Sequence, residues 1–137
     1  MKKLFVVVLL CLVTQAATRA SEAVDTFSAG LRAFQANGPD ALLNAWYGSD
    51  SETKLPDLRA RLLAISARLG PVVETETFAP KMLGKRVTRL HGVIYFQRRP
   101  LWIRADFYVA EGSSGFIALE FSTKPEEILP VEVGIAK

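Results

Sequence analysis

The stretch Leu62–Phe78 reads LLAISARLGPVVETETF, and the spacing of its apolar residues changes half-way along. Before Gly70, leucine and isoleucine recur every three or four residues, which is the spacing of one helix face. After Pro71, β-branched residues alternate with glutamates, which is typical of a strand. Glycine followed by proline ends a helix, because glycine accepts the backbone angles of the last turn and proline cannot continue it. The stretch therefore predicts helices before residue 70 and antiparallel strands after residue 71.

Three helices are predicted before this boundary. Apolar residues at spacings of three and four follow Ser21, which is the expected N-cap of the first helix. The segment 37–39, Asn-Gly-Pro, ends that helix, and Asp40 caps a shorter second one. The third helix has an apolar stripe formed by Leu55, Leu58, Leu62, Ile65 and Leu69. Each helix presents a stripe that a sheet can cover.

Four strands are predicted after the boundary, over about 72–78, 86–98, 101–110 and 115–122. A tight turn at 98–101 pairs the two central strands and decides which side chains share a face. The face expected to meet the helices carries Leu90, Gly92, Ile94 and Phe96 with Ile103, Ala105, Phe107 and Val109. The opposite face carries Arg89, His91, Val93, Tyr95 and Gln97 with Trp102, Arg104, Asp106 and Tyr108. Gly92, in mid-strand, predicts a bend or a close approach by another element.

The two ends of the chain differ from the rest in their sequence patterns. Residues 1–20 resemble a secretory signal peptide, because two lysines precede the apolar run Leu4–Val13 and small residues follow it. The run of about ten residues is too short to span a hydrocarbon core of ~30 Å. Cleavage is expected after Ala20, with Ala16 as the alternative, which predicts a periplasmic or secreted protein without a transmembrane helix. The tail, where valines flank Glu132, is either a short edge strand or a loose end.

Loss of residues 1–20 changes the charge and the available chemistry. The whole chain has 17 Lys and Arg against 14 Asp and Glu, whereas residues 21–137 contain 14 of each kind. A neutral mature chain offers no electrostatic argument for a nucleic-acid partner. The single cysteine, Cys11, lies in the removed segment, which excludes disulfides, a cysteine nucleophile and thiolate metal sites. His91 is the only histidine and no cofactor motif is present, so we expect neither a metal nor a cofactor.

The helix end Arg68-Leu69-Gly70-Pro71, the paired segments 92–96 and 104–108, and the phrase ALEFS at 118–122 carry a resemblance. In this order they resemble the nuclear transport factor and cystatin-like fold group, in particular small secreted bacterial proteins of unassigned activity. The resemblance covers essentially all of residues 21–137. It implies a single α+β domain, with helices over about 21–70 packed on a curved antiparallel sheet of about four strands over about 71–133. Members of the group include enzymes, ligand-binding pockets and dimerising scaffolds, so the fold does not select a function.

Three hypotheses for the function follow. We favour an exported, non-enzymatic binding or accessory module for a small apolar ligand or an envelope protein partner, with an apolar pocket lined by Phe27, Trp46, Ile94, Phe96 and Phe107. The second is a small hydrolase or isomerase that uses His91, Asp106 and Tyr108, although a surface histidine on an exposed strand is the simpler interpretation. The third is a homodimer through Tyr95, Trp102 and Tyr108, because aromatic residues with arginine mark interface centres.

A run of cations without any acid lies between Thr77 and Ala105. Its arginines form a predicted basic patch, which consists of Arg86, Arg89, Arg98, Arg99 and Arg104. Together with neighbouring aromatic residues, such a patch can bind an anionic sugar, a lipid headgroup or a nucleic acid. We prefer the alternative that acids on adjacent strands, such as Glu120, neutralise the patch.

Overall fold

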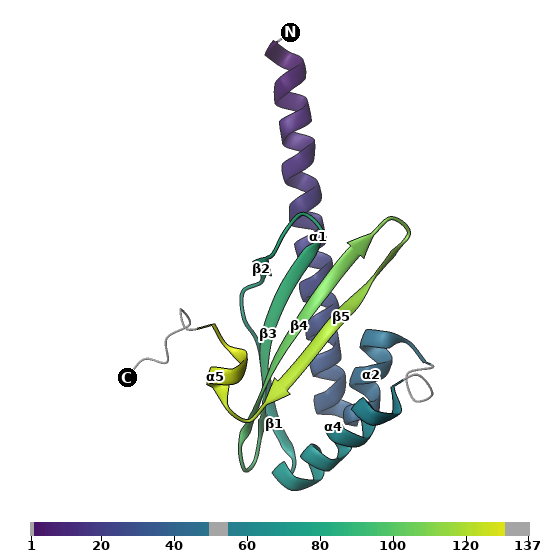
Figure 1. Cartoon of the computed structure of the whole chain (residues 1–137), viewed down its shortest axis with the longest axis vertical. Coiled ribbons are helices and arrows are strands. Elements are labelled where there is room, and N and C mark those ends of the chain that lie inside the picture. Colours follow the sequence, from purple (N-terminus) through teal and green to yellow (C-terminus); the bar gives the residue numbers. More distant parts are fainter. Residues whose placement is uncertain (1, 50–54, 131–137) are drawn as a thin grey trace.

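The protein is described by a computed structural model that covers residues 2–49 and 55–130, with side chains from residue 18 onward. Its elements are α1 (Lys2–Asn37), α2 (Pro39–Tyr47), α4 (Pro56–Leu69), β1 (Val72–Thr77), β2 (Lys81–Met82), β3 (Val87–Phe96), β4 (Pro100–Ala110), β5 (Ser113–Ser122) and α5 (Pro125–Ile128). Figure 1 shows α1 and α2 behind the sheet and the N-terminal half of α1 projecting beyond one end of it. The fold is α+β, with N-terminal helices on an antiparallel sheet that does not close into a barrel, as predicted.

The sheet has the order β1-β3-β4-β5, and the short β2 pairs with β3 beside this path. All pairs are antiparallel. Gly92 lies opposite Ile103, so the predicted faces of the central strands are confirmed. The turn was expected at 98–101 and lies at 97–99 instead, because Pro100 belongs to β4 and pairs with Tyr95. β2 lies between the first two predicted strands and was not predicted, because two residues carry too little alternation to be recognised.

The core lies between α1 and the predicted apolar face of β3 and β4. The ring of Phe27 stacks on Trp46 with centroids 5.2 Å apart, and Phe34 meets Phe96 edge-on at 5.8 Å. Gly92 explains why α1 can come so close to the sheet. A Cβ atom there would lie 2.8 Å from Cε1 of Phe27, and only glycine avoids this overlap.

The predicted boundary between helices and sheet is confirmed at Gly70. This residue has φ 88°, a left-handed backbone conformation that favours glycine, and its N–H donates to the Ser66 carbonyl at 3.1 Å. Two hydrogen bonds from Arg59 to Asp40, at 2.6 and 3.0 Å, then tie α4 to α2. The change in period thus coincides with the change in secondary structure.

Of the two expectations about the chain ends, the one for the first helix is wrong and the one for residues 131–133 stays untested. The first helix begins at Lys2 and not at Ser21, because the helix continues without interruption through the apolar run that precedes Ser21. Ser21 therefore does not cap the helix, and its hydroxyl lies 3.5 Å from a carboxylate oxygen of Asp25 as a hydrogen-bond donor. The tail after Thr123 begins with the short helix α5, whereas the segment 131–133, a strand or a loose end in the prediction, lies outside the described residues.

Candidate functional site

The centre of the predicted basic patch is neutralised by acids of the neighbouring strands. Arg89 on β3 donates two hydrogen bonds to Asp106 on β4, at 2.8 and 2.9 Å. Arg104 forms an ion pair with Glu120 on β5 through one hydrogen bond. Both acids occupy the cross-strand positions directly opposite the arginines, which is where opposite charges stabilise a sheet. The hydrogen bonds from Arg89 lower the pKa of Asp106.

His91 is buried and not a surface residue, with only 6% of its surface exposed. Its ring is hydrogen-bonded to the backbone of Ile128, because α5 packs over this part of the outer face. Burial lowers the pKa of His91 below its ordinary value of 6.5, and the nearby charges of Arg104 and Arg89 lower it further. The sequence missed this cover because a four-residue helix has no recognisable periodicity.

The three candidate catalytic residues do not form one reactive cluster. His91 lies opposite Arg104 in the sheet, and both oxygens of Asp106 are bound by Arg89. Tyr108 lies further along β4 and is 38% exposed. A general base needs a free partner within hydrogen-bond reach of the proton that it moves. This arrangement gives no support to the hydrolase or isomerase hypothesis.

The residues expected to line an apolar pocket lie in the hydrophobic core. Phe27, Trp46, Ile94, Phe96 and Phe107 are all exposed by 6% or less. The indole N–H of Trp46 donates to the Thr26 carbonyl at 3.1 Å, which fixes the ring over α1. Binding of an apolar ligand among these side chains would need the core to open, and it stays a prediction.

The three residues of the predicted dimer face do not lie together, because Tyr108 is far from Tyr95 and Trp102. Tyr95 and Trp102 are diagonal neighbours, whereas Tyr108 is six residues from Trp102, or roughly 20 Å along an extended strand. The hydroxyl of Tyr95 donates to Glu76 at 2.8 Å, which raises the pKa of Tyr95, and the Trp102 ring stacks on Phe78 at 6.3 Å. A homodimer through these residues stays a prediction.

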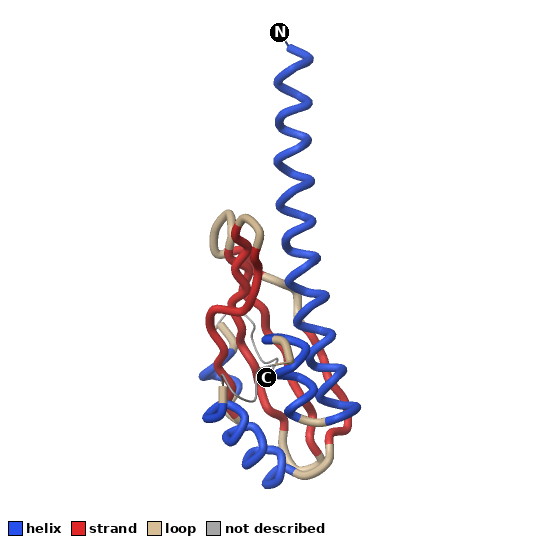
Figure 2. The backbone as a smooth tube through the Cα atoms, turned by 90° about the vertical axis from the view of Figure 1, so that its right-hand side faces the viewer, coloured by secondary structure: helices blue, strands red, loops and turns tan. Residues whose placement is uncertain are grey.

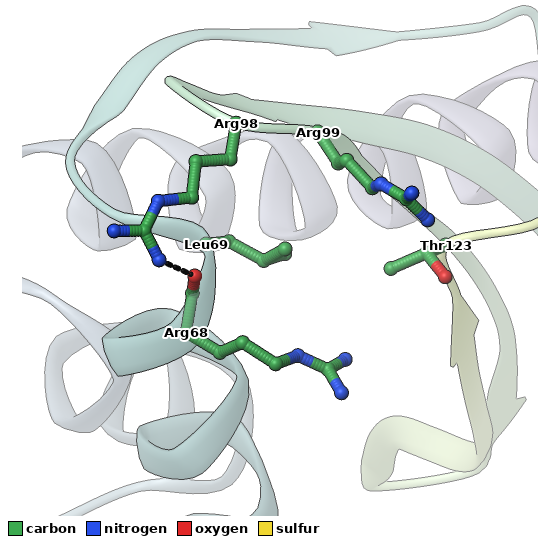
Figure 3. Close-up of a pocket in the computed structure, with 5 residues that line it drawn as sticks. All are labelled: Arg68, Leu69, Arg98, Arg99 and Thr123. Atoms are coloured by element: carbon green, nitrogen blue, oxygen red, sulfur yellow. Dashed lines mark hydrogen bonds between the residues drawn. The ribbon is translucent and has the colours of Figure 1, made fainter.

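A cavity of about 380 Å³ lies at the end of the sheet that carries the β3–β4 turn, and we call it the arginine pocket. It is lined by Arg68, Leu69, Arg98, Arg99 and Thr123. Figure 3 shows that the side chains of Arg68 and Arg99 extend toward the side on which Thr123 lies, with Leu69 between the arginines. Three elements therefore contribute to the pocket: the end of α4, the β3–β4 turn and the residue after β5.

Backbone contacts hold the β3–β4 turn against the end of α4. The N–H of Gln97 donates to the Pro71 carbonyl at 2.9 Å, and the N–H of Arg98 donates to the Leu69 carbonyl at 3.1 Å. The side chain of Arg98 then donates to the Arg68 carbonyl at 2.7 Å. This last contact satisfies a carbonyl at the C-terminus of α4, where cations are favourable. The pocket is therefore built on a fixed framework, and Arg98 is partly used by the helix end.

Arg68 and Arg99 are the groups of the pocket that remain available to a ligand. Both side chains belong to exposed residues, and neither makes an ion pair with any acid in the described part of the chain. Two guanidinium groups on one cavity can bind phosphate or carboxylate oxygens through paired hydrogen bonds. Arg98 and Arg99 belong to the predicted basic patch, whereas Arg68, which lies 30 residues before Arg98 in the chain, was not predicted. The sequence feature that could have indicated Arg68 is its position in the last helical turn before Gly70.

Neither a metal site nor a membrane span is found among the described residues. Within residues 2–49 and 55–130, no group of three or more His, Cys, Asp or Glu side chains is placed to hold a metal ion. The described helices also include none that is both long enough and apolar enough to cross a membrane. Comparisons with protein-family models, curated proteins and solved structures found no match.

Proposed function

We propose that this protein is an exported binding module whose arginine pocket takes a small anionic ligand with phosphate or carboxylate groups. The observation that carries the proposal is the pair Arg68 and Arg99, which line one cavity without an acid partner among the described residues. A cavity of about 380 Å³ lies within the usual size range of small-molecule sites. Export is supported by the signal-like residues 1–20, and the resemblance to the nuclear transport factor group stays a prediction.

The lining of the pocket favours binding over proton transfer. Guanidinium groups keep their protons at physiological pH and offer only hydrogen-bond donors. Thr123 adds a hydroxyl that can donate or accept, and Leu69 supplies an apolar floor. Such a site orients an anion and holds it by charge-assisted hydrogen bonds, which are stronger than neutral ones.

The test is calorimetric titration of the purified protein with inorganic pyrophosphate and, separately, with citrate at low salt. We expect saturable binding of at least one of the two anions. Arg68→Gln and Arg99→Gln should each weaken it by about 10- to 100-fold, since a hydrogen bond to a charged group contributes ~1.5–3 kcal/mol. Arg32→Gln is the matched control, because Arg32 is an exposed arginine on α1. Absence of binding by both anions, or an equal loss in the Arg32 variant, would refute the proposal.

A further inference from the structure

A second cationic surface lies at the opposite end of the sheet from the arginine pocket. Residues 81–86, Lys-Met-Leu-Gly-Lys-Arg, are all exposed, and we call them the basic loop. Met82 and Leu83 are 41% and 44% exposed, so two large apolar side chains lie among three cations. This mixture is typical of segments that contact lipid headgroups, because the apolar groups enter the interface while the cations meet anionic lipids.

The basic loop is held in place by three contacts. The N–H of Leu83 donates to the Val87 carbonyl at 2.9 Å, which closes the turn. The Thr88 hydroxyl donates to the sulfur of Met82 at 3.2 Å. Arg19 on α1 donates to the Lys85 carbonyl at 3.2 Å. A surface already held in its binding shape loses less conformational entropy on binding.

The contact with Arg19 also places the basic loop along α1. Figure 2 shows turns of the sheet beside α1 at the level where the helix leaves the domain. The apolar run of α1 ends at Val13, six residues before Arg19, which corresponds to roughly 9 Å along the helix axis. The headgroup region of a bilayer extends over roughly 5–8 Å on each side of the hydrocarbon core. If the apolar run enters a bilayer, the basic loop therefore lies at the outer edge of the headgroup region.

Acidic residues described at this end form no ion pair with the basic loop. Glu22 accepts a hydrogen bond from Ser114 at 2.7 Å, and Glu111 is exposed in the turn after β4. No ion pair joins Lys81, Lys85 or Arg86 to an acid in the part of the chain that the structure describes. The loop thus retains its positive charge on the side that faces away from the arginine pocket.

We propose that the basic loop is a membrane contact that binds the surface of a bilayer containing anionic phospholipids. Leu83 and Met82 enter the headgroup layer, and Lys81, Lys85 and Arg86 meet the lipid phosphates. The proposal does not depend on the arginine pocket, because the two sites share no residue. In a chain cleaved after Ala20 the basic loop remains and keeps its contacts with Val87 and Thr88, whereas the contact with Arg19 belongs to the full chain alone.

The variant Leu83→Trp, made in the full chain, places a fluorescent tryptophan in the basic loop. Its fluorescence is recorded with phosphatidylcholine vesicles that carry brominated acyl chains, with and without phosphatidylglycerol, and the signal of the unmodified protein is subtracted. We expect stronger quenching with phosphatidylglycerol present than without it. Val73→Trp is the matched control, because Val73 is 62% exposed on β1 at the far end of the sheet, and it should not be quenched. Met82→Trp is the second probe if the first variant does not fold.

Charge reversal distinguishes the contribution of the basic loop to membrane binding from that of the apolar run of α1. Adding Lys85→Glu and Arg86→Glu to the probe variant should weaken binding by at least about 25-fold, because each cation near an anionic surface contributes about fivefold. High salt should have the same direction of effect. Three results would overturn the proposal: no quenching of the tryptophan introduced into the basic loop, equal quenching in neutral and anionic vesicles, or quenching that charge reversal does not change.

Discussion

The arginines within the sheet and those around the arginine pocket have different surroundings, and the difference follows from the sheet. Arg89 and Arg104 lie in mid-strand, where each faces an acid in the neighbouring strand. Arg98 and Arg99 lie in the turn between β3 and β4, where no strand residue faces them, and Arg68 lies at a helix end. A regular sheet therefore neutralises the arginines within it and leaves those beyond its edge free for a ligand. The same residue type serves stability in one place and recognition in the other.

The largest expected difference between the two groups is in stability. Asp106→Asn should lower the free energy of unfolding by about 2 kcal/mol, because it leaves the partly buried Arg89 without its charged partner. Arg99→Gln should change it by less than about 0.5 kcal/mol, because Arg99 is exposed. Urea denaturation at neutral pH measures both.

A double variant provides the control for this comparison. Arg89→Gln combined with Asp106→Asn should lose less than the sum of the two single changes, since the unpaired charge is then absent. Equal losses in Asp106→Asn and Arg99→Gln would show that the two groups of arginines do not differ in this way.

A single substitution should give the arginines of the pocket an acidic partner like those of Arg89 and Arg104. Thr123→Asp adds a carboxylate to the lining that contains Arg68 and Arg99. It should weaken pyrophosphate binding by about tenfold, or ~1.4 kcal/mol, because the new charge pairs with the arginines and repels the anion. Calorimetric titration measures the loss, and Thr123→Asn is the matched uncharged control. Unchanged affinity in the aspartate variant would place the anion elsewhere.

The smallest expected effect is the pH dependence of stability, which belongs to the outer face. His91 has a lowered pKa in the folded protein, so the unfolded chain binds its proton first as the pH falls below 6.5. Stability contributed by the neutral ring is full above 6.5 and is lost as the pH falls toward the folded pKa. Between about pH 6.5 and pH 5.5 the loss should be at most ~1 kcal/mol, because a single proton is involved.

His91→Gln should remove this dependence, while Arg99→Gln should retain it. Urea denaturation midpoints at several pH values check both variants. A His91→Gln protein with the same slope as the unmodified protein would contradict the assignment. Asp106 contributes in a separate window, because its pKa is lowered from 3.8 and its stabilisation is lost only at more acidic pH.

Much of the fold was predictable because it depends on local rules. The helix end at Gly70 follows from backbone chemistry that two neighbouring residues specify. The parity of β3 and β4 was predictable, but their register was not, because a turn was expected at 98–101 whereas Tyr95 pairs with Pro100 around a turn at 97–99. The partition into an apolar and a polar face then follows from alternation alone.

The candidate site was only partly predictable, because it combines residues that are distant in the chain. Arg98 and Arg99 were recognised as cations, but nothing in the sequence places Arg68 beside them. Their proximity depends on how α4 packs against the end of the sheet, which is recorded in the contact of Arg98 with the Arg68 carbonyl. The cover over His91 was missed for the same reason, because α5 is defined by its packing on the sheet.

Short-range spacing alone therefore determined the α+β class, the boundary between helices and strands, and the two faces of the central hairpin. These properties depend on backbone angles and side-chain periodicity, which neighbouring residues dictate. Only the tertiary structure decided which arginines meet acids, which lie free around a cavity, and that the histidine is buried. Charge pairing and burial depend on distances between segments far apart in the chain, and those distances exist only after the helices have packed on the sheet.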